Sequence, residues 1–279
     1  MNNISFRFDV DTHKCIREGV PNILELAKAN QVKFTFFINM GKSVSRFEMI
    51  KSIIRQKDAH SRASSEKGAS LSAFRKLGIK DYIQIVLLNP PIKKYSMQIR
   101  SILDNGHEIG LHGGKNHQSW ADKSLGWTER KLRKEVNWGL RELQKIFPGY
   151  QPKGFASPAW VHPELLNKVL LDLGFEYCAD LRGEGYREMS WDSCLKFPTT
   201  TILGEPGGIA ILEHLIAMGA SQESVVQEVV DMFKTKSNYI AYDHPYFAGV
   251  EALPILSSVV TTLLIDGYEF QTISKITDA

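Results

Sequence analysis

Apolar and polar positions alternate with two different periods along this chain, and the switches between the periods predict strands followed by helices. Residues 4–8 have an apolar side chain at every second position, which predicts a strand. Residues 20–27 repeat apolar side chains at helical spacing, and residues 32–38 form a second apolar run typical of a buried strand. Strand, helix and strand within about 35 residues indicate a βαβ unit, and therefore a parallel sheet.

The regular alternation stops between residues 42 and 95. This stretch mixes Ser, Lys and Arg with two short helical runs and a Pro90-Pro91 pair. So long a segment between regular elements is typical of an insertion or a lid. We expect it to be inserted after the second strand of a single domain that spans residues 1–279.

Beyond residue 95 the alternation returns and predicts the rest of an α/β barrel. About seven strand–helix pairs without any repeat in the sequence itself favour an irregular (β/α)7-type barrel over a solenoid. The predicted helices cover residues 96–103, 127–147, 164–173, 221–233 and 253–266, and the predicted strands cover residues 107–111, 154–156, 177–179, 195–197, 209–212 and 239–242.

Composition narrows the class of protein only a little. Apolar residues make up 43% of the chain and charged residues 23%, which is ordinary for a globular protein. The three cysteines are too scattered for a disulfide framework, and neither a signal peptide nor an apolar run of membrane-spanning length is evident. We therefore expect a soluble protein of a reducing compartment, with the cytoplasm as the default.

Positive charge is concentrated in and around the expected insertion. Residues 41–100 carry 13 Lys or Arg against four Asp or Glu, although the net charge of the whole chain is only +3. One interpretation is a solvated lysine-rich surface, and the other is a surface for phosphate or anionic lipid head groups on the inner face of a membrane. No nucleic-acid-binding motif accompanies the charge, so nucleic acid is not an expected partner.

Asp9 and Asp11 follow each other at the end of the first predicted strand. Two residues apart on a strand, both carboxylates leave on the same face, about 6–7 Å from each other. Because barrel active sites gather at the carboxyl ends of the strands, the pair suits a general base and a metal ligand. The alternative is a loop start in which an Asp side chain caps the next turn.

A second cluster runs through the glycine-rich segment 106–117. Its His107, Glu108 and His112 lack the i, i+4 histidine spacing of a zincin helix, and β-branched Ile109 between glycines suits a strand instead. His112 then lies at the exit of that strand and His117 one loop further on. Imidazoles suit zinc and other first-row divalent metals, with Asp11 as an oxygen ligand, although a structural pair of histidines is the alternative.

Tyr242-Asp243-His244 ends another predicted strand, and a histidine there can exchange a proton near neutral pH. Glu213-His214 has the same layout with weaker support. The remaining histidines resemble surface or loop residues: His13, His60 and His162. Motifs of serine hydrolases, P-loop NTPases and dinucleotide enzymes are absent from the sequence, so these classes are disfavoured.

Taken in order, these segments resemble the motifs of the polysaccharide deacetylase (NodB-homology, carbohydrate esterase 4-like) family over nearly the whole chain. Within that family the chain looks most like the lipid-linked formamido-arabinose deformylases, which share an Arg-x-Asp-Val-Asp-Thr opening and an insertion before a Gly-Leu-His segment. The segments that carry the resemblance are Phe8 to Asp11, Arg17 to Pro21, Gly106 to His112, Phe155 to Trp160, Asp180 to Gly183 and Tyr242 to His244.

The resemblance implies a role for each matching residue. Asp9 would be the general base and His244 the general acid, while Asp11, His112 and His117 would hold a divalent metal, zinc first, with Fe, Co, Mn or Ni as alternatives. Backbone N–H groups near Ala159 and Trp160 would face the oxyanion, and Asp180 and Arg182 would contact substrate.

Two positions depart from the family pattern. The family's metal histidines are usually four residues apart, whereas His112 and His117 are five apart, so either the loop bulges or Asn116 takes the ligand position. The arginine common in the third motif is also absent, since Ser157-Pro158 stands in its place.

The expected function is metal-dependent removal of a formyl or acetyl group from an amino sugar, lipid-linked or nucleotide-linked, in envelope polysaccharide synthesis. Two alternatives remain open: an amidohydrolase of small amides such as ureides on the same scaffold, and a metal-free sugar-binding protein that has lost catalysis. Metal content separates the last from the first two.

Overall fold

The computed structural model describes residues 2–43, 88–183, 188–192, 194–203, 210–235 and 240–278. Their strands form one curled sheet in the order β6-β7-β5-β4-β3-β2-β1-β8, with β9 paired to the start of β1. The strands are β1 (Asn2–Val10), β2 (Thr35–Ile38), β3 (Glu108–His112), β4 (Gly154–Ala156), β5 (Tyr177–Cys178), β6 (Glu188–Trp191), β7 (Leu195–Pro198), β8 (Ile240–Asp243) and β9 (Tyr268–Phe270).

Parallel pairing runs through the sheet, and only β6 is antiparallel to its neighbour, β7. Just beyond β7, Thr201 forms a parallel bridge with Ala241 of β8, and this bridge links the two ends of the curled sheet. The predicted (β/α)7-type barrel is therefore confirmed. Of the expected insertion over 42–95, residues 44–87 lie outside the described residues.

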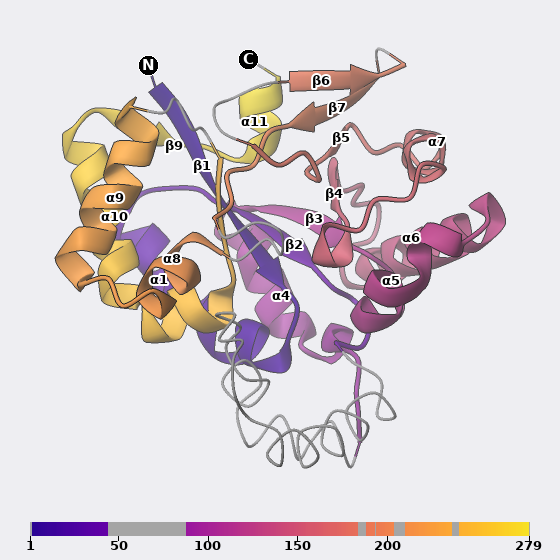
Figure 1. Ribbon diagram of the computed structural model, residues 1–279. Helices are drawn as coiled ribbons and strands as arrows, with labels where there is room; N and C mark the ends of the chain where they lie inside the picture. Colours follow the sequence, from indigo (N-terminus) through magenta and orange to yellow (C-terminus); the bar gives the residue numbers. More distant parts are fainter. Residues whose placement is uncertain are drawn as a thin grey trace, which may run out of the picture.

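Helices cover the outside of the sheet on two flanks, with α8, α9, α10 and α1 on one and α5, α6 and α7 on the other (Figure 1). The α-helices are α1 (Val20–Asn30), α4 (Ser96–Asp104), α5 (His117–Lys123), α6 (Glu129–Ile146), α7 (Leu166–Asp172), α8 (Ile211–Ala217), α9 (Gln222–Thr235), α10 (Leu253–Ile265) and α11 (Ile273–Thr277). The described residues also form two π-helical turns, η1 (Cys15–Gly19) and η5 (Phe247–Glu251). There are in addition three 3₁₀ turns among them: η2 (Ile92–Lys94), η3 (Ser124–Gly126) and η4 (Pro158–Trp160).

The alternation in β1 separates two environments. Its even-numbered side chains, Ile4 to Val10, belong to the apolar core that also includes the outer helices. Of its odd-numbered side chains, Asn3 is partly buried, and Ser5, Arg7 and Asp9 are fully buried. Buried charges must be paired, as Arg7 and Asp9 are here, and this row leads directly to the carboxyl end of the strand, where Asp11 follows.

The predicted strand over 209–212 is wrong, because Ile211 begins helix α8 instead. The buried carboxylate of Asp243, at the end of β8, accepts a hydrogen bond from the Leu212 N–H at 2.8 Å. It thereby caps the first turn of this helix. A short apolar run does not reveal such a remote cap. The sequence pattern did not predict β6, which pairs with the predicted strand β7, nor β9, α5 and α11.

Helix α11 closes the end of the barrel opposite Asp11. The Ile273 N–H donates to Thr35 Oγ1 at 2.9 Å, and the Ser274 N–H donates to Glu108 Oε2 at 3.1 Å. Glu108 also accepts hydrogen bonds from Thr35 Oγ1 at 2.8 Å and from Tyr177 Oη at 3.0 Å. Glu108 is thus the acceptor on which this end of the barrel is assembled, and burial raises its pKa.

Replacing Glu108 with alanine is expected to lower the free energy of unfolding by about 2–4 kcal/mol, because three buried donors lose their acceptor. Glu108→Gln is the matched control, since it keeps the size of the side chain and one acceptor oxygen but cannot ionise. The folded-state pKa of Glu108 lies above its unfolded value of 4.5, so the stability that depends on its proton is lost as pH rises through the folded value. Urea unfolding at several pH values should show wild type losing stability relative to Glu108→Gln above pH 4.5; parallel curves would contradict this assignment.

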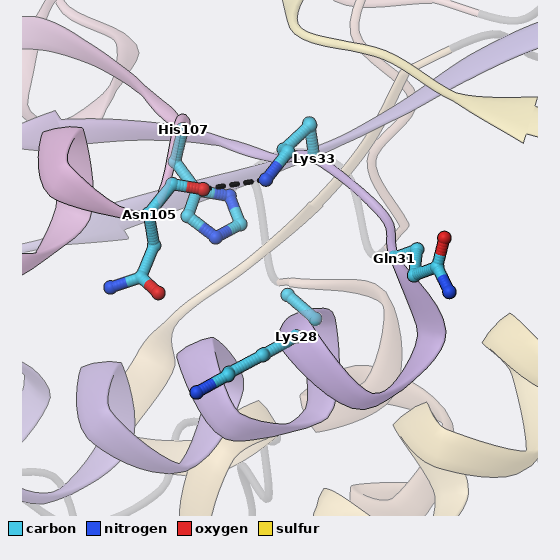
Figure 2. Close-up of a pocket in the computed structure, with 6 residues that line it drawn as sticks. Lys28, Gln31, Lys33, Asn105 and His107 are labelled. Carbon is cyan, nitrogen blue, oxygen red and sulfur yellow. Dashed lines mark hydrogen bonds between the residues drawn. The ribbon is translucent and has the colours of Figure 1, made fainter.

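A hollow of about 390 Å³ lies where α1 ends and β2 approaches, at the amino ends of the strands. Figure 2 shows Lys28, Gln31, Asn105 and His107 around it, with Lys33 donating a hydrogen bond to the Asn105 carbonyl at 2.6 Å. This end of a barrel usually serves stability rather than chemistry. The candidate catalytic residues lie at the other end, where the strands have their carboxyl termini.

Candidate active site

Side chains from three strands meet at the carboxyl edge of the sheet. Asp9 and Asp11 come from the end of β1, His112 ends β3, and His244 follows β8. β8 is a direct neighbour of β1, and β3 is one strand further on the other side. Residues far apart in sequence are thus brought together because parallel strands end at one edge.

Asp11 is the centre of this group. Its Oδ1 lies 3.1 Å from His112 Nε2, and its Oδ2 lies 3.3 Å from His117 Nε2. These three side chains, called the Asp11 cluster below, each offer a ligand atom within 4.8 Å of the others. His112 is held by its other ring nitrogen, Nδ1, at 3.0 Å from the Ala156 carbonyl.

The five-residue interval between the two histidines is explained by the loop that joins them. Gly113 adopts a left-handed backbone with φ +68°, and a Cβ there would lie 2.4 Å from Pro158 Cγ, so the turn requires glycine. Asn116 then caps helix α5, its side-chain oxygen accepting a hydrogen bond from the Ser119 N–H at 2.8 Å. His117 is the first residue of that helix and reaches Asp11, while the Asn116 oxygen is already engaged.

The charged groups of the Asp11 cluster shift each other's pKa values towards the charged forms. Burial alone would raise the pKa of Asp11, but the imidazoles of His117 and His112 hold it well below its usual range. Burial alone would lower the pKa of His112, yet Asp9 and Asp11 raise it. Asp11 Oδ1, His112 Nε2 and His117 Nε2 are all buried without a hydrogen-bond partner among the described residues. Buried polar atoms in this state need an explanation, and a shared cation provides one.

Asp9 is fixed by Arg7, two residues earlier on the same strand. Arg7 Nε and a terminal nitrogen donate to the two carboxylate oxygens, each at 2.8 Å, in a bidentate pair. A further guanidinium N–H donates to the Ala179 carbonyl. Arg7 thus orients Asp9 from the first strand, in a chain that lacks the arginine common in the family's third motif.

Aromatic rings surround the Arg7 guanidinium. Its central carbon lies 4.2 Å from the ring centroid of Trp160, 4.9 Å from that of Phe37 and 5.2 Å from that of Tyr242. These cation–π contacts compensate in part for burying a charge. The Trp160 backbone N–H donates to the Ser157 carbonyl at 3.1 Å, so this amide is engaged, and the Trp160 ring contacts Arg7 and Tyr242.

His244 faces the Asp11 cluster from the other side. Its Nε2 lies 3.3 Å from Asp11 Oδ2 and 2.9 Å from Tyr242 Oη, and its Nδ1 lies 3.5 Å from Glu213 Oε2. Tyr246 Oη donates to the same Glu213 oxygen at 2.6 Å. Burial would lower the pKa of His244, but Asp11 and Glu213 raise it well above its usual value.

Glu213 is the residue of this site that sequence reasoning missed. The pattern made His214 the candidate at this position, but Glu213 is the side chain that reaches His244. The signal was an acidic residue inside an apolar run, Ile211 to Leu215, where a carboxylate is expensive to bury without a partner.

Asp180 lies away from the Asp11 cluster, in contact with His162. Asp180 Oδ2 is 2.7 Å from His162 Nδ1, and its Oδ1 accepts from the Ser157 N–H at 2.7 Å. Arg182 is exposed, and its backbone forms a bridge with Thr200. The substrate role predicted for these two residues stays a prediction.

Two histidines expected at the surface are placed differently. His162 is partly buried in its pair with Asp180. His13 is fully buried beside the ring of Tyr95, and burial together with Lys94 lowers its pKa to about 4. A single buried histidine following a strand cannot be distinguished from a loop histidine by sequence pattern. His60 lies outside the described residues.

The donor set of the Asp11 cluster suits a divalent first-row metal. One carboxylate and two imidazoles leave further coordination positions open, which is the arrangement of catalytic rather than structural zinc sites. The backbone contact of His112 Nδ1 fixes its tautomer, as the outer contacts of metal-bound histidines usually do. The residues therefore fit a metal ion.

Comparison with known proteins agrees with this geometry. The chain is 29% identical over 191 residues to a Shewanella sediminis protein described as a probable 4-deoxy-4-formamido-L-arabinose-phosphoundecaprenol deformylase, covering 66% of this chain and 58% of that protein. A protein of the same description from Wigglesworthia glossinidia brevipalpis is 24% identical over 265 residues, covering 90% of this chain and 85% of that protein. The chain thus spans less than two thirds of the length of the Shewanella relative.

Solved structures share the fold. A Mycobacterium smegmatis protein described as a polysaccharide deacetylase superposes with a TM-score of 0.62 at 18% identity, covering 99% of this chain and 88% of that protein. Among the described residues, no helix has the length and apolar character needed to cross a bilayer. The model of the polysaccharide deacetylase family matches residues 2–178. Most of the curled sheet and the Asp11 cluster lie within this match, and the chain belongs to the polysaccharide deacetylase family.

Proposed function

We propose that this protein hydrolyses the N-acyl group of an amino sugar, with formyl as the first candidate acyl group. The observation that carries the proposal is the placement of one paired carboxylate, Asp9, and one paired imidazole, His244, on either side of Asp11. Asp9 Oδ2 is 3.9 Å from His112 Nδ1, while His244 Nε2 is 3.3 Å from Asp11 Oδ2. Two proton-transfer groups around one candidate metal position suit amide hydrolysis.

Asp11, His112 and His117 would hold the metal ion, with zinc as the first candidate. When bound, such an ion polarises the acyl carbonyl and lowers the pKa of nearby water. Asp9 accepts a proton from the attacking water, because Arg7 occupies only one position on each of its oxygens and leaves the others open. The water oxygen bonds to the carbonyl carbon as that proton leaves.

His244 then protonates the departing nitrogen while the carbon–nitrogen bond breaks. The products are a free amino sugar and the carboxylic acid. Glu213 and Tyr242 hold the imidazole from two sides, and Glu213 favours the charged form that donates the proton. The mechanism therefore uses one base and one acid that are positioned by different neighbours.

Similarity to two proteins described as lipid-linked formamido-arabinose deformylases supports a formamido sugar on a lipid carrier as substrate. An envelope polysaccharide pathway follows from the same support. Peripheral contact with an anionic membrane stays a prediction from the basic composition of residues 42–95. The division into one barrel domain with an inserted lid also stays a prediction.

The proposal is tested by measuring acid release from N-formyl and N-acetyl amino sugars, free and lipid-linked. The purified chain is assayed after chelation and after adding back zinc, cobalt or manganese. We expect formate release that chelation abolishes and one of these metals restores. Absence of metal uptake together with absence of release from any substrate would favour the sugar-binding alternative, and release from ureides alone would favour the small-amide alternative.

Glu213→Gln is expected to lower kcat about 10-fold with little change in KM, because His244 loses the partner that favours its protonated form. The glutamine keeps the size of the side chain and its contact with Tyr246. Glu213 raises the pKa of His244, and His244 must be protonated to act as the acid. The decline of kcat at high pH should therefore begin at lower pH in the variant. An unchanged pH profile would show that Glu213 only packs against His244.

A further inference from the structure

A second group of metal-ligating side chains lies outside the reaction centre. His162 follows η4, Cys178 ends β5, and Asp180 comes two residues later. Asp180 Oδ2 is 2.7 Å from His162 Nδ1 and 3.2 Å from Cys178 Sγ, and Cys178 Sγ is 3.8 Å from His162 Nδ1. Sulfur, nitrogen and oxygen donors therefore converge on one point.

Each of the two polar ligands has a further partner that fixes it. His162 Nε2 lies 2.6 Å from Asn167 Oδ1, and the other Asp180 oxygen accepts the Ser157 N–H at 2.7 Å. A metal-bound histidine typically donates its second N–H to a carbonyl oxygen, and a metal-bound carboxylate typically accepts a hydrogen bond on its free oxygen. Both outer contacts are present here.

The spacing is close to what zinc requires. With zinc–donor distances of about 2.0 to 2.3 Å, donors in a tetrahedral site lie about 3.3 to 3.6 Å apart. The three observed separations differ from this range by about 0.1 to 0.6 Å, within reach of small side-chain rotations. Thiolate, imidazole and carboxylate together favour zinc over calcium or magnesium, which prefer oxygen ligands.

Charge balance also favours a divalent ion. Without metal, the thiol and an imidazolium donate to the ionised Asp180, and the group is neutral. Zinc binding forms Zn–S, Zn–N and Zn–O bonds and releases two protons to water, one from the Cys178 thiol and one from His162 Nδ1. The bound group holds Zn²⁺, a thiolate, a neutral imidazole and a carboxylate, and is again neutral. No uncompensated charge is buried in either state.

A cavity of about 310 Å³ reaches this group from the surface. His162, Asn167 and Asp180 line it together with Trp191 and Phe197 from the β6–β7 hairpin, which lies at the edge of the sheet next to β5 (Figure 1). Cys178 is fully buried behind Asp180 and His162, which it contacts. The cavity provides an entry path and room for a water ligand or a small molecule at the fourth position.

We propose that His162, Cys178 and Asp180 form a second zinc site, separate from the Asp11 cluster. Through Ser157 this site would stabilise the turn that carries Trp160 onto Arg7. The inference goes beyond the proposed function, because it needs neither a substrate nor a reaction.

Cobalt tests the proposal, since only a thiolate ligand gives cobalt an intense near-ultraviolet charge-transfer band. The parent protein for this test is the full chain with Cys194→Ser, which removes the exposed cysteine. Three proteins are titrated with Co²⁺: this parent, the parent with Cys15→Ser added, and the parent with Cys178→Ser added. We expect a band that accounts for one thiolate-bound cobalt per chain, beyond the cobalt taken up by the Asp11 cluster, and that persists in the Cys15→Ser protein and disappears in the Cys178→Ser protein. Zinc should abolish the band by competition.

Asn167→Ala leaves all three ligands in place and serves as the second variant. Loss of an outer contact to a metal-bound histidine should weaken cobalt binding by about 10- to 100-fold. Absence of the band in the folded parent protein, or its persistence in the Cys178→Ser protein, would overturn the second site. Neither result would affect the proposed function, which fails only if metal-dependent acid release is absent.

Discussion

Asp9→Asn is expected to lower kcat for N-acyl sugar hydrolysis by about 100-fold or more, because the general base is lost. Asparagine keeps the shape of the side chain but cannot accept the proton of the attacking water. KM should change little, since Arg7 and not the substrate is the observed partner of Asp9. Steady-state kinetics with the metal restored provides the measurement, and a kcat within threefold of wild type would show that the base is misassigned.

The pairing with Arg7 determines how this variant must be controlled. Asp9→Asn leaves a buried guanidinium without its counter-charge, which can cost several kcal/mol of stability. The free energy of unfolding must therefore be measured alongside kcat, so that lost folding is not read as lost chemistry. Arg7→Lys is the matched variant, because it keeps the charge and the Asp9 carboxylate but replaces two parallel donors with a single ammonium.

Arg7→Lys should reduce kcat by about 10-fold, less than Asp9→Asn, because the base is present but less well oriented. The ordering of the two effects is the informative result. If Arg7→Lys reduces kcat more than Asp9→Asn does, Arg7 contacts substrate or the reacting atoms directly, and its assignment as a positioning residue is wrong.

Much of the barrel follows from local sequence pattern. Residues 154–156 and 195–197 were predicted as strands and lie in β4 and β7, and the helices over 96–103 and 253–266 match α4 and α10 within a residue or two. Their apolar periodicity reflects one face packed on the sheet, and that is a local property. The pattern fails at α8, where the cap comes from Asp243, thirty-one residues later.

The site was predictable to the extent that it lies at strand ends. Asp9, Asp11, His112 and His244 could be proposed because parallel strands end at one edge and because the motifs resemble a known family. Glu213 could not, since its role depends on α8 packing beside β8. Arg7 was visible in the sequence as part of an Arg-x-Asp, but its bidentate contact with Asp9 becomes evident only when both side chains turn into the barrel.

Asp11→Ala is expected to abolish tight metal binding at the Asp11 cluster and to lower kcat by about 1,000-fold, corresponding to about 4 kcal/mol of transition-state stabilisation. Asp11 contacts both imidazoles, so its loss removes one donor and the group that holds the other two together. Metal content after dialysis and kcat at saturating metal are the two measurements. Full activity in chelated wild-type protein would refute any role for a metal at this cluster.

His117 and Asn116 allow a sharper test of the same site, because they are neighbours with different predicted roles. His117→Ala should weaken metal binding and reduce kcat nearly as far as Asp11→Ala, since a direct ligand is lost. Asn116→Ala removes the cap of α5 and should cost about 1 kcal/mol of stability while metal binding is retained. The opposite outcome, with metal lost in the Asn116 variant and kept in the His117 variant, would mean that the loop rearranges when the ion binds and that the four-residue interval of the family applies here after all.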